Sequence, residues 1–216
     1  MEQVNPENQC AQLMKHTEYR EDALNYMLSM QNSLQEFVGK VRGTKFPKSE
    51  MTDSQRADEA IYFWGCAVTE WAELIDARDM FLFVYDSEKN RLEMQYEFID
   101  IWHFMMNVFL YTGIDSSVAT LKEIYDEESE ENTIEHFWSE LNYWVGRYIN
   151  NLPYKHWKTY KEYVIDDTDL ALCFTNIMSL LVNIAKELGI DNERFYDLYV
   201  SKNEENINRQ SRADYV

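Results

Sequence analysis

Two pairs of acidic residues stand three positions apart inside otherwise apolar segments of this chain. The first pair, Glu70 and Glu73, has tryptophan, leucine and isoleucine beside it, and the second, Glu97 and Asp100, has phenylalanine, isoleucine and tryptophan. Residues three apart share a helix face, and burying unpaired carboxylates is strongly unfavourable. Basic side chains or metal ions must therefore compensate them. An acidic pair at the edge of a core helix is the simpler alternative for either pair alone.

If the two helices that carry these pairs pack antiparallel, the four carboxylates converge. Four like charges stay ionised together in a dry site only beside cations. Hard oxygen ligands suit Mg²⁺ or Mn²⁺, and such ions can activate water and stabilise a leaving phosphate. A structural Ca²⁺ site is the alternative, although the sequence has no Asp-rich loop with EF-hand spacing.

The elements that must position these acids are expected to be helices. The chain has only six Gly and three Pro, and its apolar residues recur mostly at helical spacing. Capping residues and helix-ending glycines predict helices over residues 22–41, 53–83, 95–113, 116–125, 132–151, 167–188 and 191–209. The fold class predicted is all-α, a helical bundle in a single domain that spans residues 1–216.

Composition limits the partners that this domain can have. With 45% hydrophobic residues and a net charge of −19, the chain repels nucleic acid and anionic membrane surfaces. A polyphosphate substrate would need divalent cations and a few well-placed basic residues. Three scattered cysteines fit reduced thiols, no signal peptide is visible, and the apolar run around 101–114 is too short to span a bilayer. We therefore expect a cytoplasmic protein.

An internal repeat divides the chain. Residues 101–115 resemble residues 177–191, and both segments end in Gly-Ile-Asp after an apolar helix. In this register the acids of the first copy correspond in the second to Gly146, Ile149, Cys173 and Asn176. We therefore predict a duplicated helical hairpin, with a catalytic half at about 22–115 and a degenerate half, followed by the tail, at about 116–216. The alternative is that two buried helices resemble each other by chance.

The tail supplies the basic residues. Lys202, Asn206 and Arg209 recur at i, i+4 and i+7, so one helix face presents two cations and an amide. Such a face suits a triphosphate, and a solvated terminal helix is the alternative.

Three ordered motifs resemble those of a known family. They are Glu70-x-x-Glu73, the block Glu97-Phe-Ile-Asp100-Ile-Trp-His-Phe, and Lys202-Asn-Glu-Glu-Asn206-Ile-Asn-Arg209-Gln. Together they resemble the all-α nucleoside triphosphate pyrophosphohydrolases, above all the dimeric dUTPases and the bacteriophage dCTP/dUTP pyrophosphatases.

The resemblance implies that the four acids hold Mg²⁺ while water attacks the α-phosphorus, releasing a nucleoside monophosphate and pyrophosphate. It also implies a homodimer. The substrate-binding residues that it implies are Gln31 in the base pocket, Asn107, Trp157, and the phosphate contacts Lys202, Asn206, Arg209 and Tyr215.

Two departures from the family pattern bear on the substrate. The family's Gly before the closing Tyr is replaced, since Ala213-Asp214 precedes Tyr215. The Trp-Lys motif, which in the family falls between the acid pairs, appears here as Lys155-His-Trp157-Lys158 in the second half. Trp157 can contact the substrate from there or serve only in packing.

The function predicted is magnesium-dependent hydrolysis of dUTP to dUMP and pyrophosphate, with Mn²⁺ as a possible substitute. The alternatives within this class are hydrolysis of dCTP, hydrolysis of both nucleotides, and a broad house-cleaning activity on nucleoside triphosphates. An acidic helical inhibitor that mimics nucleic acid is the alternative outside it.

Overall fold

The computed structural model describes residues 20–42, 50–80, 87–113, 121–126, 132–152 and 167–210. These residues form helices and no strand, which confirms the all-α class. The helices are α2 (Ala23–Arg42), α3 (Asp53–Met80), α4 (Ser87–Thr112), α5 (Leu121–Asp126), α6 (Ile134–Asn151), α7 (Asp167–Glu187) and α8 (Asn192–Gln210).

Local signals account for most of the helix boundaries. Gly113 and Gly189 follow α4 and α7 with φ of 75° and 72°, a left-handed conformation that glycine adopts at little cost. Thr133 caps α6, its hydroxyl accepting from the backbone N–H of His136 at 3.3 Å. One boundary was predicted wrongly: α4 begins at Ser87, not near residue 95, because polar residues continue the helix without contributing to the apolar pattern.

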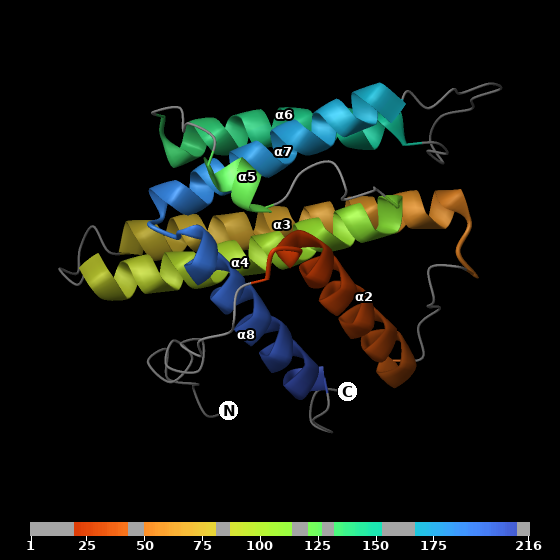
Figure 1. Cartoon of the computed structure of the whole chain (residues 1–216), viewed down its shortest axis with the longest axis horizontal. Coiled ribbons are helices and arrows are strands. Elements are labelled where there is room, and N and C mark those ends of the chain that lie inside the picture. Colours follow the sequence, from red (N-terminus) through yellow and green to blue (C-terminus); the bar gives the residue numbers. More distant parts are fainter. Residues whose placement is uncertain are drawn as a thin grey trace.

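The helices form three layers (Figure 1). The long antiparallel pair α3 and α4 lies in the middle, α6 and α7 cover one side of it, and α2 and α8 cross the other side. The centre of α4 is buried all round, with Phe98, Trp102, Met105 and Phe109 at most 1% exposed. The predicted acid pairs therefore lie on the two helices that pack most extensively on each other.

A stack of tryptophans joins the α6–α7 pair to the central layer. Trp138 of α6 lies between Trp64 and Trp71 of α3, with ring centres 5.4 and 4.3 Å away, and the Trp71 and Trp138 rings are almost parallel at 4°. Arg78 of α3 also pairs with Glu135 of α6. This contact fixes α6 beside the part of α3 that carries Glu70.

Helix α7 is the most apolar helix and packs chiefly on α6. Phe174 meets Phe109 of α4 edge-on at 4.9 Å. By length and hydropathy, Thr168–Glu187 could also cross a membrane, although half of its most apolar stretch is buried in the protein. Among the described residues this helix, and not the run around 101–114, is long and apolar enough to span a membrane. One such helix is weak evidence for a membrane span, because the core helix of a soluble protein has the same length and hydropathy.

The second hairpin offers no acid cluster at the positions equivalent to the first. Gly146 and Ile149 lie on α6, Cys173 is fully buried on α7, and the amide of Asn176 donates to the carbonyl of Leu172 at 2.8 Å. The duplication itself stays a prediction.

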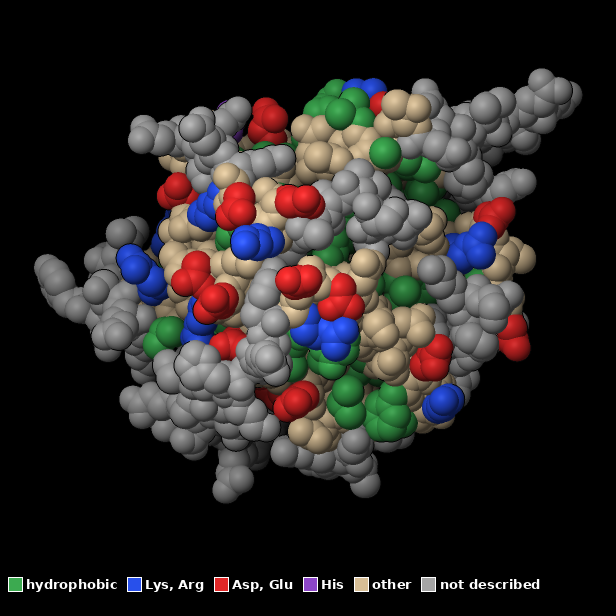
Figure 2. Space-filling model, in the orientation of Figure 1, with side chains coloured by type: hydrophobic (Ala, Val, Ile, Leu, Met, Phe, Trp, Pro, Cys, Tyr) green, Lys and Arg blue, Asp and Glu red, His purple; other side chains and the backbone are tan. Residues whose placement is uncertain are grey.

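The surface seen in Figure 2 mixes acidic and basic side chains, with apolar side chains reaching it in separate groups. The largest exposed apolar side chains among the described residues are Tyr62, Tyr143, Leu172, Val68 and Val41.

Candidate active site

Three of the four predicted acids converge where α3 and α4 pack together. Glu70 of α3 and Glu97 and Asp100 of α4 each offer a carboxylate oxygen, and these oxygens all lie within 4.8 Å of one another. Each residue is half-buried. The antiparallel packing expected from the sequence therefore brings the two motifs into one cluster.

The charges of this cluster repel one another in a poorly hydrated place. Burial, then the charges of Asp100 and Glu73, raise the pKa of Glu70 to about 7. Burial and the same neighbouring charges raise the pKa of Glu97 to about 7, and burial also raises the pKa of Asp100 against the opposing effect of Lys202. The protein alone thus provides too little positive charge to keep all three acids ionised at neutral pH.

Glu73 lies at the edge of this cluster. Its side chain is exposed and is not among the three that converge, although its charge contributes to the raised pKa of both Glu70 and Glu97. It is near enough to act on them electrostatically while facing solvent.

Lys202 lies beside Asp100 and over the ring of Tyr96. Its side chain is 2% exposed, its Nζ lies 2.8 Å from Asp100 Oδ2, and the same atom lies 3.3 Å from the centre of the Tyr96 ring. The resemblance implied a phosphate contact for Lys202. In this structure its ammonium is engaged by a carboxylate of the acid cluster and by an aromatic face.

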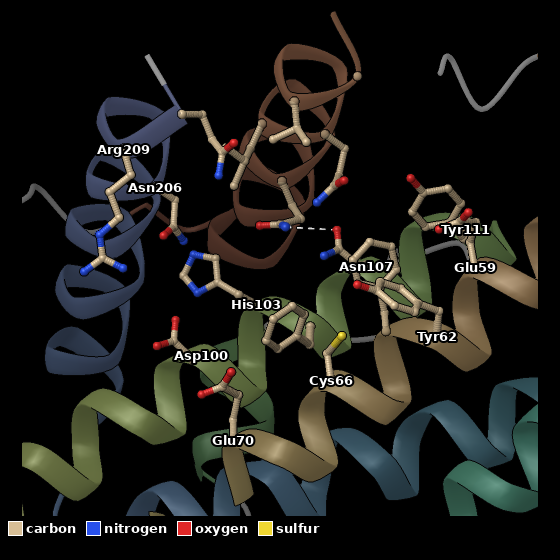
Figure 3. A pocket seen from close by; sticks show the side chains of 18 of the residues that line it. Glu59, Tyr62, Cys66, Glu70, Asp100, His103, Asn107, Tyr111, Asn206 and Arg209 are labelled. Atoms are coloured by element: carbon tan, nitrogen blue, oxygen red, sulfur yellow. Dashed lines mark hydrogen bonds between the residues drawn. The ribbon is translucent and has the colours of Figure 1, made fainter. Parts of the chain in front are cut away.

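Asn206 and Arg209, one and two turns further along α8 than Lys202, line the cavity instead. Arg209 pairs with Glu205, and its Nη2 donates to the Tyr96 hydroxyl at 3.3 Å. The Tyr96 hydroxyl donates in turn to Glu205 at 2.8 Å. Glu205 and Tyr96 thus hold the guanidinium of Arg209, which lies at the edge of the cavity in Figure 3.

The cavity has a volume of about 550 Å³ and is bounded by α2, α3, α4 and α8. This size is ordinary for a small-molecule site. Asp100, His103 and Asn107 follow one another along the same face of α4 and line it, as Figure 3 shows. Its walls therefore combine acids, a guanidinium and neutral polar groups.

Two buried side-chain amides, one on α2 and one on α4, contact each other about two turns of α4 beyond Asp100. Gln31 Nε2 of α2 donates to Asn107 Oδ1 at 2.9 Å, and the two side chains are 2% and 1% exposed. The Tyr199 hydroxyl of α8 lies 3.1 Å from Gln31 Oε1 and 3.0 Å from the carbonyl of Met27. Two predicted substrate-binding residues thus contact each other and line the cavity together.

His103 presents one fixed hydrogen-bond acceptor beside these amides. Its Nδ1 donates to the carbonyl of Ile99 at 2.8 Å, its ring stacks on Tyr199 at 4.2 Å, and burial lowers its pKa to about 3. The ring is therefore neutral, and its Nε2 carries the lone pair. This buried atom has no protein partner among the described residues, so a ligand donor is its natural complement.

Comparison with known proteins agrees with this geometry. A family model described as dUTPase matches residues 23–215, which is nearly the whole chain. The chain belongs to the all-α dUTPase family. No curated protein and no solved structure matches it significantly. Membership of the dUTPase family makes the chain a nucleoside triphosphate pyrophosphohydrolase and implies a nucleotide substrate.

The residues of this family member fit a hard divalent cation. Three carboxylate oxygens within 4.8 Å form an all-oxygen donor set of the kind that Mg²⁺ and Mn²⁺ prefer. Two of the acids have a pKa of about 7, which is the expected consequence of a site that lacks its counter-charge.

Two predicted residues of the dUTPase site lie outside the described residues. These are Trp157, with its flanking Lys155 and Lys158, and Tyr215.

Four residues that shape the site had no role predicted from the sequence: His103, Tyr96, Tyr199 and Glu205. His103 stands three residues after Asp100, hence on the same helix face, and that spacing was the available signal. The other three owe their role to the way α8 packs on α2 and α4, which spacing does not predict.

Proposed function

We propose that this enzyme hydrolyses dUTP to dUMP and pyrophosphate and that the reaction depends on Mg²⁺. The observation that carries the proposal is the cluster of Glu70, Glu97 and Asp100 opening onto a cavity whose other walls present Arg209, Asn206 and the Gln31–Asn107 pair. The reaction requires acids that bind the metal, a cation that binds the phosphates and polar groups that bind the base, and the cavity provides all three.

The metal would be held by Glu70, Glu97 and Asp100, with Glu73 completing the set from the solvent side. When bound, Mg²⁺ neutralises phosphate oxygens and lowers the pKa of a coordinated water. The water oxygen forms a bond to the α-phosphorus, the bond from that phosphorus to the α,β-bridging oxygen breaks, and pyrophosphate leaves. The carboxylates of the cluster accept the proton that the water loses.

The triphosphate is assigned to the end of α8. Arg209 lines the cavity, and Glu205 and Tyr96 already orient it, so little side-chain freedom is lost on binding. Asn206 lines the same wall and can donate its amide. Lys202 would have to leave Asp100 to reach a phosphate, so we assign it to the acid cluster.

The nucleoside is assigned to the end of the cavity that carries Gln31, Asn107 and His103. Amides and a neutral imidazole provide directed donors and acceptors without a net charge, which is what an uncharged base and a deoxyribose hydroxyl require. Mn²⁺ is expected to substitute for Mg²⁺.

We further propose a homodimer in the cytoplasm. The proposal of two copies follows from the resemblance to the dimeric dUTPases. Nucleic acid and membranes are not expected partners, because the net charge is −19.

The test is release of pyrophosphate from dUTP, dCTP, dTTP and UTP, each with Mg²⁺ and with excess chelator. We expect turnover of dUTP that requires the metal. Glu97→Gln should lower kcat by orders of magnitude, and the matched variant Glu93→Gln, one turn earlier on α4, should not. Hydrolysis that persists in chelator, or an active Glu97→Gln variant, would remove the acid cluster from the mechanism.

A further inference from the structure

Gln31 and Asn107, the amide pair in the cavity wall, lead to an inference that rests on the proposed function and extends it to a second base. Hydrogen bonds connect Tyr199, in the interior of the protein, through Gln31 to Asn107 at the cavity wall. Both amides are almost fully buried, at 2% and 1% exposure. Their unmet hydrogen bonds would therefore be costly.

The Tyr199 hydroxyl has two acceptors and one proton. It lies 3.0 Å from the Met27 carbonyl and 3.1 Å from Gln31 Oε1, and it donates to one of them at a time. When it donates to Gln31 Oε1, Gln31 Nε2 donates to Asn107 Oδ1 at 2.9 Å. The Met27 carbonyl, inside α2, then keeps its ordinary helical partner.

Rotation of both amides by half a turn gives a second network on the same atomic positions. The Tyr199 hydroxyl then donates to the Met27 carbonyl and accepts from the Gln31 amide N–H. The Gln31 oxygen accepts from the Asn107 amide N–H. Each contact of the first network is kept and still joins one donor to one acceptor, because an amide oxygen and nitrogen are nearly the same size.

The two networks differ in what Asn107 presents to the cavity. In the first, the outer atom of Asn107 is Nδ2, a donor, which has no partner among the described residues and points into the cavity in Figure 3. In the second, the outer atom is Oδ1, an acceptor. One position on the wall can thus offer either polarity.

Uracil and cytosine differ in just this respect at ring position 4. Uracil carries an oxygen there, which accepts, and cytosine carries an amino group, which donates. We propose that the Tyr199–Gln31–Asn107 relay reverses to match either group, so that the same pocket binds dUTP and dCTP. The stacking of His103 on Tyr199 at 4.2 Å keeps the hydroxyl in place in both states.

The first experiment compares the two nucleotides on the wild-type enzyme. Turnover of dUTP and dCTP is measured with Mg²⁺, and binding of their α,β-imido analogues is measured by calorimetry. A fixed polar site rejects a mismatched group by about 10⁴-fold or more, whereas the relay predicts kcat/KM values, and affinities, within about tenfold of each other.

Binding and turnover together separate this proposal from the proposed function. Discrimination above about 1000-fold in both turnover and binding would overturn the relay and leave hydrolysis intact. Equal binding without turnover would support the relay and contradict hydrolysis. If neither analogue binds, both proposals are wrong.

The second experiment locks the relay. A carboxylate at position 31 accepts from both Tyr199 and Asn107, so Gln31→Glu holds the Asn107 oxygen toward the cavity and should favour dCTP over dUTP by more than about tenfold. Asn107→Asp, which presents only acceptors, should shift the ratio in the same direction. Gln35→Glu adds the same charge to the same cavity wall at a residue that takes no part in the hydrogen bonds of the relay, and its dUTP/dCTP ratio should match the wild type.

The ratio, and not the activity, is the measurement that decides. A ratio that moves in neither Gln31→Glu nor Asn107→Asp, with folding verified by circular dichroism, would overturn the relay. So would an equal shift in Gln35→Glu, because the effect would then come from charge alone.

Discussion

Replacing Lys202 with methionine tests how the acid cluster is kept together without metal. The substitution keeps an unbranched side chain of similar length but removes a charge that is 2% exposed and 2.8 Å from Asp100. It also removes the cation above the Tyr96 ring. Asp100 then remains beside Glu70 and Glu97 with no ammonium to offset its charge.

Removing one partner of a buried ion pair destabilises a protein by about 3–5 kcal/mol. The Asp100 side chain is 20% exposed and can take up a proton, so the lower end, about 3 kcal/mol, applies. For a chain of this length each kcal/mol shifts Tm by about 2–4 °C. We therefore expect the metal-free Lys202→Met variant to melt about 6–12 °C below the wild type.

The assay is thermal unfolding with and without saturating Mg²⁺. Bound metal replaces the missing positive charge, so the difference in Tm should shrink when Mg²⁺ is present. Adding Asp100→Asn to Lys202→Met should restore much of the metal-free stability, because both charges are then gone. Lys122→Met, at an exposed position on α5, is the matched control and should change stability by less than about 0.5 kcal/mol.

Two results would refute this reasoning. A Lys202→Met variant as stable as the wild type without metal would show that the ion pair contributes nothing. A loss of Tm that is the same with and without Mg²⁺ would show that Lys202 acts in packing alone and not through the charge of the cluster.

Three further predictions concern the same molecule. The pKa of Glu70 and of Glu97 rises on folding from 4.5 to about 7, so these groups stabilise the fold fully below about pH 4.5 and lose this contribution as the pH rises through 7. The Tm of the metal-free protein should therefore fall between about pH 5 and pH 8, and Mg²⁺ should raise Tm more at pH 8 than at pH 5. A Tm that does not change with pH would contradict the raised pKa values. Arg209→Ala should raise KM for dUTP by about ten- to a hundredfold, since a charge-assisted phosphate contact contributes about 1.5–3 kcal/mol, and unchanged kinetics would make the end of α8 ordinary surface. Light scattering at micromolar concentration should give the mass of two chains, and the mass of one chain would contradict the homodimer.

The sequence predicted the helices well because their ends carry local signals. Gly113, Gly189 and Thr133 act through their own conformation or hydrogen bonds, so no knowledge of packing is needed. The start of α4 was missed because residues 87–94 have no apolar pattern. The convergence of Glu70 with Glu97 and Asp100 was predictable from spacing and from the short connection between two long helices.

The roles within the site were less predictable. Residues three apart on a helix differ by about 60° in direction, which is enough for Glu70 to face the cluster while Glu73 faces solvent. Lys202 and Arg209 both looked like phosphate contacts because they share a face of α8. Along its length this face passes from the core to the edge of the cavity, so Lys202 contacts Asp100 and Arg209 lines the cavity. Tertiary packing, and not the spacing of the residues, sets this difference.

The stacked indoles of Trp64, Trp138 and Trp71 give this enzyme a built-in optical reporter. Two nearly parallel rings with centres 4.3 Å apart couple their electronic transitions, so the near-ultraviolet circular dichroism of the stack depends on α6 staying docked against α3. Trp71 directly follows Glu70 in the chain. A loosened α6–α7 hairpin would therefore lose this signal, while a variant damaged only in the acid cluster would keep it, and the two kinds of defect can be told apart in one spectrum without a label.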